Sequence, residues 1–277
     1  MTKTWFITGA SKGFGREWAE AALERGDKVA ATARRLETLD ALVDTYGDAV
    51  LPIQLDVTDR SADFDAVERA ADHFGTLDIV VNNAGYGHFG MVEELTEDDV
   101  RAQMETNFFG ALWVTQAALP IMRAQGSGRI LQVTSEGGVR TFAGFGAYHA
   151  SKWAVEGLSQ TLAEEVASFG IHVTLVEPGP YRTDFGGGSL RQSSPDPAYD
   201  GVREATAPEF ELGDPRATRA AILQVVDAEV PPLRVLLGRS FAPVKAEYEK
   251  RLATWQEWEP LALAAFGADD RTATADA

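Results

Sequence analysis

The stretch Thr8-Gly9-Ala10-Ser11-Lys12-Gly13-Phe14-Gly15 follows an apolar run at residues 4–8 and opens an amphipathic stretch at residues 14–25. A strand, a glycine-rich turn and a helix in this order form the place where a parallel sheet receives a pyrophosphate. Glycines let the backbone approach a ligand closely, and the helix N-terminus presents unpaired N–H groups. The spacing Gly-x-x-x-Gly-x-Gly therefore predicts a nucleotide-binding turn made by Gly9, Ser11, Lys12, Gly13, Phe14 and Gly15.

Apolar runs recur along the next part of the chain and alternate with amphipathic stretches. The runs lie at residues 28–33, 50–55, 78–82, 129–134 and 171–177, and the amphipathic stretches at residues 36–46, 61–74, 112–124 and 147–169. Each run is apolar on both faces, as expected for strands of a parallel sheet that helices cover on both sides. Short connections favour right-handed crossovers. The pattern predicts an α/β fold, a doubly wound, mostly parallel, Rossmann-like sheet of about seven strands with helices on both faces.

The alternation breaks after Phe185. Residues 186–215 are rich in glycine and proline and show little periodicity, so we expect a structureless lid over the site. The remaining expectations are a helix at residues 215–229, a strand at 233–237, a helix carrying Tyr248, Trp255 and Trp258, and a frayed tail at 267–277. No second domain is visible, so residues 1–277 are expected to form one.

Composition excludes several classes of function. Forty-two acidic and 25 basic residues give a net charge of −17, which disfavours nucleic acid as a partner. The chain has no cysteine, which removes disulfides and thiol catalysis and fits a reducing cytoplasm. No apolar run is long enough to span a bilayer, and the first run begins too early to leave room for a signal peptide. No His or carboxylate spacing indicates a metal site, so we expect a cytoplasmic protein without a metal.

The end of the second run, Ala31-Thr32-Ala33-Arg34-Arg35, bears on the choice of nucleotide. An acidic residue there binds the adenosine ribose of NAD, and this run has none. Lys12 and Arg34 together suit the 2′-phosphate of NADP and favour NADP(H) by about tenfold or more. The alternative is that the arginines are solvated surface charges. Asp56, which follows the third run, meets the adenine ring or caps the next helix.

The stretch Tyr148-His149-Ala150-Ser151-Lys152 carries the chemistry. Residues four apart share one face of a helix, so the ammonium of Lys152 lies beside the phenol of Tyr148. A phenol has a pKa near 10, about three units above neutral pH. We expect Lys152 and the positive ring of an oxidised nicotinamide to lower that pKa together, because nearby cations favour the phenolate. His149 is one helical step away and is expected to pack or face solvent.

Other polar residues close the strands at the same edge of the predicted sheet. Ser135 follows the run at residues 129–134, Asn82-Asn83-Ala84-Gly85 closes the fourth run, and Pro178-Gly179 closes the sixth. The carboxyl ends of parallel strands form the crevice in which such sheets bind ligands. The hydroxyl of Ser135 is therefore placed to hold a substrate carbonyl while Tyr148 transfers a proton. Glu136 is expected to line the pocket or to cap a turn.

With these motifs in this order, the chain resembles the short-chain dehydrogenase/reductase superfamily, in its compact branch of roughly 250 residues. The resemblance rests on Thr8-Gly9-x-x-x-Gly13-x-Gly15, Asn82-Asn83-Ala84-Gly85, Asn107, Ser135, Tyr148-x-x-x-Lys152 and Pro178-Gly179. It implies a catalytic tetrad of Asn107, Ser135, Tyr148 and Lys152, in which Asn107 anchors a water of the proton relay. It also implies that Lys152 binds the nicotinamide ribose, that Thr183 lies near the carboxamide or pyrophosphate, and that Asn83 stabilises the central strand.

The remaining implied cofactor contacts are Asp56, Val57, Asn83, Ala84, Gly85, Pro178, Gly179 and Tyr181. In many relatives the helices corresponding to residues 112–124 and 147–169 form the subunit contact, so the resemblance implies a homo-oligomer, a dimer or tetramer.

The expected activity is an NADP(H)-dependent transfer of hydride between nicotinamide and a carbonyl or secondary alcohol. Aromatic residues are expected to line the pocket and to favour an apolar or ring-containing substrate; with neighbouring residues they are Tyr86, His88, Phe89, Val139, Phe142, Phe145, Tyr181 and Phe185. Three alternatives stay open: an NAD-dependent alcohol dehydrogenase, a nucleotide-sugar epimerase or dehydratase, and a non-catalytic nucleotide-binding regulator. The glycine spacing and the short chain disfavour the second. The third needs the glycine turn but has no use for Tyr148.

Overall fold

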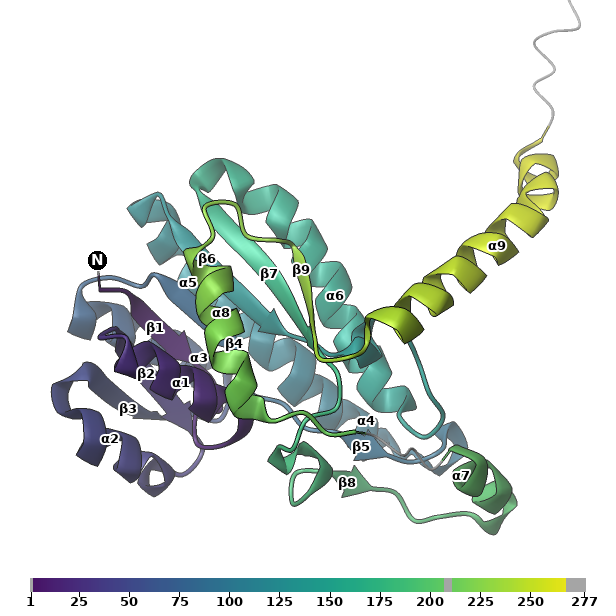
Figure 1. Cartoon of the computed structure of the whole chain (residues 1–277), viewed down its shortest axis with the longest axis horizontal. Helices are drawn as coiled ribbons and strands as arrows, with labels where there is room; N and C mark the ends of the chain where they lie inside the picture. Colours follow the sequence, from purple (N-terminus) through teal and green to yellow (C-terminus); the bar gives the residue numbers. More distant parts are fainter. Residues whose placement is uncertain (1, 207–210, 268–277) are drawn as a thin grey trace, which may run out of the picture. The chain divides into compact units, whose positions relative to one another are not determined.

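A computed structural model describes residues 2–206 and 211–267 of the chain (Figure 1). The chain divides into two compact units, Met1–Gly238 and Arg239–Ala277, where the sequence pattern predicts one domain. The first unit holds every strand of the described residues, and the second contributes helix α9 (Phe241–Phe266), which carries the expected aromatic residues. Residues 268–277 of the predicted tail lie outside the described residues.

One sheet of seven parallel strands organises the first unit, in the order β3-β2-β1-β4-β6-β7-β9. The strands are β1 (Thr4–Ile7), β2 (Lys28–Ala33), β3 (Val50–Gln54), β4 (Ile79–Asn82), β6 (Gly128–Val133), β7 (Ile171–Pro178) and β9 (Arg234–Leu237). This confirms the doubly wound sheet. The strand order changes direction between β1 and β4, which pair in parallel. The crevice beyond their carboxyl ends is therefore the expected ligand site.

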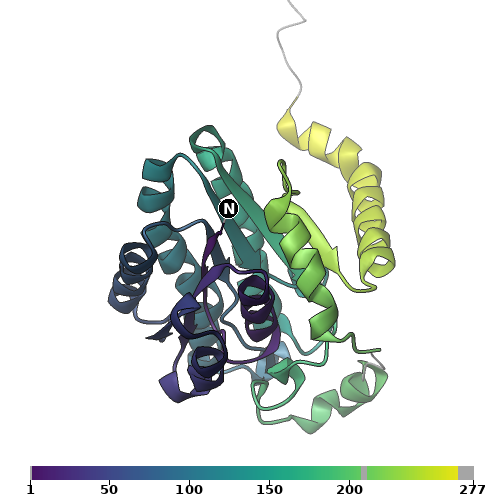
Figure 2. The same ribbon diagram turned by 60° about the vertical axis from the view of Figure 1, so that its left-hand side comes forward.

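Helices cover both faces of the sheet (Figure 2). The helices α1 (Gly13–Glu24), α2 (Asp40–Tyr46) and α8 (Thr218–Asp227) pack on one face, and α3 (Arg60–Phe74), α5 (Gly110–Gln125) and α6 (Gly146–Val166) on the other. Successive side chains of a strand point to opposite faces. Trp5 and Ile7 accordingly enter the first cluster and Phe6 the second, which is why the run is apolar throughout.

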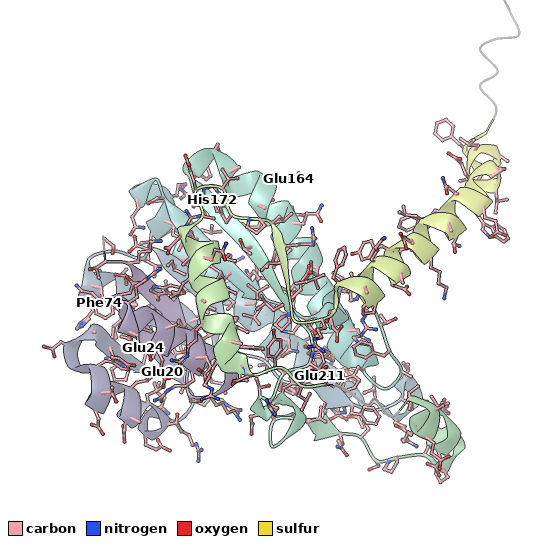
Figure 3. The ribbon with its side chains drawn as sticks, viewed as in Figure 1. Glu20, Glu24, Phe74, Glu164, His172 and Glu211 are labelled. Atoms are coloured by element: carbon pink, nitrogen blue, oxygen red, sulfur yellow. The ribbon has the colours of Figure 1, made fainter. Side chains whose placement is uncertain are left out.

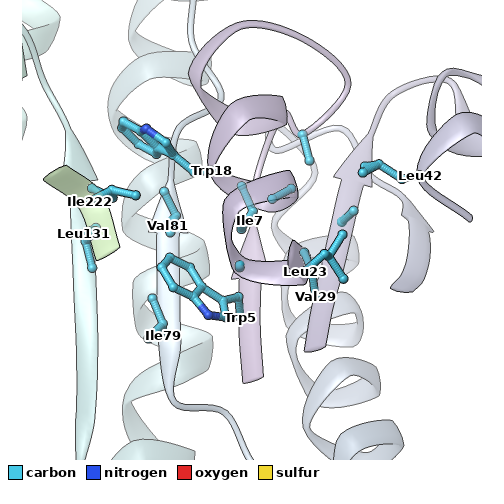
Figure 4. Packing of buried hydrophobic residues seen from close by; sticks show 14 of the residues in the cluster. Trp5, Ile7, Trp18, Leu23, Val29, Leu42, Ile79, Val81, Leu131 and Ile222 are labelled. Atoms are coloured by element: carbon cyan, nitrogen blue, oxygen red, sulfur yellow. The ribbon is translucent and has the colours of Figure 1, made fainter. Parts of the chain in front are cut away.

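Two tryptophans anchor the layer that carries α1 (Figure 4). Trp5 is fully buried and donates from Nε1 to Asp27 Oδ2 at 2.8 Å. Trp18 is also fully buried, and its Nε1 donates to Thr218 Oγ1 at 2.8 Å, which ties α1 to α8. A buried tryptophan combines a large apolar surface with one N–H that needs a partner. These contacts hold α1, and so its N-terminus, in place.

The surface between the same two helices is an ion-pair cluster. Arg219 of α8 reaches three glutamates of α1: it pairs with Glu17 at 2.7 Å, with Glu24 at 2.9 Å, and also with Glu20. Figure 3 labels Glu20 and Glu24 on α1. The acidic side chains of α1 are thus partly neutralised by one guanidinium.

Residues 90–110 contain elements that the sequence pattern does not predict. Helix α4 (Glu97–Met104) begins at Thr96, whose hydroxyl accepts from the Asp99 N–H in a capping box. A π-helical turn, Glu105–Phe109, connects α4 to α5. The first turn of α4 is Glu97, Asp98 and Asp99, so apolar periodicity is too weak there to mark a helix.

The segment at residues 186–215 is not structureless, which corrects the expectation. It contains β8 (Arg191–Gln192), which pairs in parallel with β5 (His88–Phe89), and α7 (Asp200–Thr206). Arg203 of α7 pairs with Glu94, and the Tyr199 hydroxyl donates to Glu93 at 2.5 Å. Elements this short carry no readable periodicity. Residues 207–210 of this segment lie outside the described residues.

No helix in the described part of the chain has both the length and the apolar character required to cross a membrane.

Candidate active site

The glycine turn is shaped by backbone that only glycine adopts without strain. Gly9 and Gly13 have φ of +66° and +57°. A Cβ at Gly15 would lie 2.5 Å from both Gly9 O and Asn83 Nδ2, so no side chain fits there. Asn83 ties the turn to the end of β4, because its amide donates to Thr8 O at 2.9 Å and to Gly9 O at 3.2 Å.

The N-terminus of α1 opens onto this turn. Within the described residues, no side chain caps the helix at its N-cap residue, Lys12. The first N–H groups of a helix need an outside partner. A bare helix N-terminus beside a tight glycine cradle fits the pyrophosphate of a dinucleotide. The neighbouring predicted contacts also gather here: Ala84 N donates to Thr8 Oγ1 at 2.9 Å, and a Cβ at Gly13 would lie 3.6 Å from Thr183 Cβ.

Lys12 has a partner that the sequence pattern does not reveal. Its ammonium pairs with Asp184 and donates to Ser189 Oγ at 2.9 Å, so it joins the glycine turn to the segment after β7. Arg34 is exposed at the end of β2, where its carbonyl accepts from Gln54 Nε2 at 3.1 Å. The expected convergence of Lys12 and Arg34 on one phosphate stays a prediction.

Asp56 and Val57 follow β3 and have different surroundings. Asp56 Oδ1 accepts from the Thr58 N–H at 3.1 Å and from its hydroxyl at 2.9 Å. The cap of α3 is Asp59, which accepts from Ser61 N, so the expectation that Asp56 caps that helix is wrong. Val57 is buried against Gly110, where a Cβ would lie 2.7 Å from Val57 Cγ2.

Tyr148 and Lys152 lie one helical turn apart on α6, and both are buried. Lys152 Nζ lies 5.9 Å from the centroid of the Tyr148 ring and donates to Val133 O at 2.8 Å. Ser135 follows β6 and accepts from Gly137 N at 3.0 Å, and a Cβ at Gly137 would lie 3.2 Å from Tyr148 Cε1. The phenol, the ammonium and the hydroxyl that the sequence pattern singles out are thus in one place.

Burial, rather than Lys152, dominates the proton affinity of Tyr148 in the free protein. Burial raises the pKa of Tyr148 to about 12; the Ser135 side chain lowers it and nearby Glu136 raises it. Burial also lowers the pKa of Lys152 to about 8. The expected lowering of that pKa by Lys152 together with the ring of an oxidised nicotinamide stays a prediction. Tyr148 stands as a neutral phenol, the form that donates a proton.

Asn107 lies in the π-helical turn and is buried. Its Oδ1 accepts from Tyr86 N at 3.1 Å, and its Nδ2 donates to Tyr86 O at 3.0 Å and to Ser151 Oγ at 3.0 Å. A Cβ at Gly85 would lie 3.1 Å from Asn107 Oδ1 and 3.5 Å from Lys152 Nζ. A side chain at Gly85 would therefore crowd Asn107, and π-helical turns are frequent at functional sites.

Aromatic rings surround Tyr148. The ring of Phe185 lies 5.1 Å from that of Tyr148 and the ring of Phe145 lies 6.1 Å from it, measured between centroids. Phe142 packs on Phe145 at 5.9 Å. His149 is buried against Phe142, and burial lowers the pKa of its imidazole to about 4, which agrees with a packing role.

Other predicted pocket residues have partners of their own. Tyr181 packs on Phe14 at 5.1 Å and against the apolar cluster that includes α1, and its place in the pocket stays a prediction. His88 is buried and shares a hydrogen bond of 2.9 Å with Ser193. Glu136 is buried and pairs with Arg140 at 2.9 Å.

Pro178 and Gly179 lie at the end of β7, on the carboxyl edge of the sheet. The carbonyl of Pro178 accepts from Ser135 Oγ at 3.4 Å, and Gly179 N donates to Leu237 O at 2.9 Å. Over the described ranges, no group of three or more His, Asp or Glu side chains is placed to hold a metal ion.

The family profile described as short chain dehydrogenase matches residues 3–193, and the chain belongs to this family. At 277 residues it is slightly longer than the compact branch that the sequence resembles. It is 43% identical over 276 residues to Oxidoreductase BOA17 of Botryotinia fuckeliana, covering 95% of this chain and 99% of that protein. It is 38% identical over 239 residues to the 3-ketodihydrosphingosine reductase of Bacteroides thetaiotaomicron, covering 84% and 86%.

Solved structures agree with the fold. A short-chain dehydrogenase from Streptomyces avermitilis superimposes with a TM-score of 0.89 at 42% identity, over 95% of this chain and 98% of that one. An alcohol dehydrogenase of Thermococcus sibiricus, at 28% identity and a TM-score of 0.70 over 86% and 96%, was solved with 5-hydroxy-NADP. A 3-ketoacyl-(acyl-carrier-protein) reductase of Brucella melitensis, at 26% and 0.74 over 85% and 96%, was solved with NADH. The family thus uses both nicotinamide cofactors.

Proposed function

We propose that the chain is an NADP(H)-dependent oxidoreductase that interconverts a carbonyl and a secondary alcohol, with Tyr148 as general acid and base. The observation that carries the proposal is the meeting of Tyr148, Lys152 and Ser135 at the carboxyl edge of the sheet. The glycine turn opens at the same edge, where Asn83 binds the turn and a Cβ at Gly85 would lie 3.5 Å from Lys152 Nζ. A nucleotide sensor would need the turn but not this buried trio.

When bound, the reduced nicotinamide supplies a hydride to the carbonyl carbon. Ser135 Oγ donates a hydrogen bond to the carbonyl oxygen and so fixes its position beside the phenol. Tyr148, protonated because burial raises its pKa, gives its proton to that oxygen. Lys152, beside the ring, stabilises the phenolate left behind, and Asn107 holds the backbone of Tyr86 at the entrance to the proton path. In the oxidising direction Tyr148 takes the proton back.

The choice of NADP(H) rests on charge. The residues that would hold the 2′-phosphate are Lys12 and Arg34, both exposed and both at the mouth of the turn. The pair between Lys12 and Asp184 is a surface ion pair, and such pairs contribute little. A phosphate with nearly two negative charges is a stronger partner for Lys12 than one carboxylate.

Replacing both cations, Lys12→Ala with Arg34→Ala, is expected to lower the preference for NADPH over NADH by about tenfold or more. The measurement is kcat/KM for each cofactor with one ketone substrate. Arg35→Ala is the matched control, because Arg35 is an equally exposed neighbour that lies 3.8 Å from Glu37, and its ratio should stay at the wild-type value. An unchanged ratio in the double variant would instead support the NAD-dependent alternative.

The substrate class rests on the rings around Tyr148. Phe185, Phe145 and Phe142 bring apolar surface to the reacting hydroxyl, which suits an apolar or ring-containing ketone or alcohol. A panel of carbonyls and alcohols, followed by the absorbance of reduced nicotinamide, tests this. Preferential turnover of small charged keto acids would contradict it. Cofactor binding without turnover anywhere on the panel would favour the regulator instead.

The proposal extends to assembly and location. From the family layout we infer a homo-oligomer joined through α5 and α6, and sedimentation of the purified protein tests this assembly. The proposed partner is a small molecule in the cytoplasm, and nucleic acid is not expected to bind.

A further inference from the structure

A group of buried charged side chains lies near Lys152, beyond it along α6, and none of them takes part in the proposed reaction. Glu156 follows Lys152 by one turn of α6, Glu177 lies on β7, and Arg234 on the edge strand β9. The two glutamates expose only 5% and 3% of their surface. Carboxylates are almost never buried to this extent unless they are paired. Only one feature of this group is visible in the sequence: Lys152 and Glu156 are four residues apart and so share one face of a helix.

Both carboxylate oxygens of Glu156 are held in place. Oε1 accepts from Thr134 Oγ1 at 2.7 Å, and Oε2 accepts from Arg234 Nε at 3.0 Å. The same guanidinium nitrogen lies 3.4 Å from Glu177 Oε1, and Nη2 donates to Gln160 at 2.8 Å. Arg234 is therefore shared between two carboxyl groups. Arg234 is thus the guanidinium on which both buried carboxyl groups converge.

Burial and the neighbouring Glu156 raise the pKa of Glu177 to about 8, whereas Arg234 acts to lower it. Glu177 is therefore a neutral acid at neutral pH. Burial also raises the pKa of Glu156, but Thr134, Arg234 and Lys152 all act to lower it. Glu156 is consequently the member of the pair that carries the charge.

The groups that face Lys152 show where this charge acts. Tyr148 lies beside Lys152 on α6, and Val133 O of β6 accepts a hydrogen bond from its ammonium. Asn107 lies on the other side of Gly85, in the π-helical turn. These three groups are neutral. Burial lowers the pKa of Lys152, and Glu156 is the group that raises it. Without the anion one turn further along α6, a buried ammonium loses its proton more readily.

We propose that Glu156 is a positioning residue for Lys152: its carboxylate, held by Arg234 and Thr134, keeps the ammonium charged from the turn of α6 that follows Lys152. The inference deepens the proposed function and rests on it, because it takes Lys152 as the partner of Tyr148. The described contacts thereby assign a role to the last strand, β9, which supplies the guanidinium that holds Glu156.

Glu156→Gln removes the charge and keeps the shape. Loss of the anion lowers the pKa of Lys152, so the ammonium is lost at lower pH and the alkaline limb of the kcat/KM profile moves down by about one pH unit. Glu156→Asp keeps the charge and is expected to restore the limb. Glu164→Gln is the matched control on the exposed side of α6 (Figure 3) and should leave the profile unchanged. A limb at the wild-type pH in folded Glu156→Gln overturns the proposal.

Two measurements do not depend on turnover. The pH at which NADPH affinity weakens, read from nicotinamide fluorescence, is expected to fall in Glu156→Gln, and an unchanged titration counts against the proposal. An infrared band of a protonated carboxyl at neutral pH is expected in the wild type and should vanish in Glu177→Gln; a wild type without this band contradicts the assignment of the negative charge to Glu156 rather than Glu177. If the protein turns over no substrate but shows both effects, the proposed function is wrong and the interaction of Glu156 with Lys152 is still supported.

Discussion

Tyr148→Phe is expected to lower kcat for ketone reduction by about a thousandfold, because it removes the only hydroxyl of the side chain that gives the proton. The ring remains, so its packing against Phe145 and Phe185 is kept. The dissociation constant of NADPH should stay within about threefold of the wild-type value, since the phenol contributes to the chemical step more than to ground-state binding. Steady-state turnover and fluorescence titration separate the two quantities.

A matched control for this variant is Tyr46→Phe at the end of α2, which removes a hydroxyl remote from Ser135 and Lys152. Its kcat should equal that of the wild type. Turnover of Tyr148→Phe near the wild-type rate would assign the proton to another donor and remove the main support of the proposed mechanism.

Gly15→Ala is expected to abolish measurable cofactor binding, a loss of about a hundredfold or more in affinity, and to lower the free energy of unfolding by about 1–3 kcal/mol. The added methyl would meet Gly9 O and Asn83 Nδ2 at 2.5 Å each. One contact is backbone and the other is an amide that itself bonds the turn, so neither yields without moving the cradle.

Gly157→Ala on α6 is the control for Gly15→Ala. Gly157 is exposed, and a Cβ there meets nothing within 4 Å. Alanine in an exposed helix interior is about 0.8–1.0 kcal/mol better than glycine, so this variant should unfold at equal or higher denaturant concentration. Denaturant melts and NADPH titrations of the two variants give opposite outcomes if the steric argument holds. Wild-type affinity in Gly15→Ala would show that the turn adapts.

The sheet was predictable because each strand is buried on both faces and bounded by turn residues. The pairing of Tyr148 with Lys152 was predictable for a similar reason, since four residues on a helix fix a shared face. Asn107 is different: it has no spacing partner in sequence, and only the resemblance to a family singles it out. The structure places it in a π-helical turn, an irregularity that no apolar period announces.

Contacts between distant segments explain most of what the sequence pattern did not predict. The pairing of Lys12 with Asp184 and of Glu156 with Arg234 joins residues far apart in the chain. The raised pKa of Tyr148 in the free protein has an origin of the same kind. Its largest cause is burial, which depends on how Phe185 and its neighbours close over the ring rather than on the lysine four residues away.

The π-helical turn at Glu105–Phe109 has a consequence for how this chain can change in length. A π-helical turn has more residues per turn than the α-helices on either side, so it determines the directions in which the side chains of the following helix point. Deleting one residue there would let α4 and α5 merge into a regular helix, and the amide of Asn107 would swing by about 100° away from the Tyr86 backbone. We therefore expect insertions and deletions to be tolerated in the segment that carries β8 and α7, and to abolish the function of the site when they fall between α4 and α5.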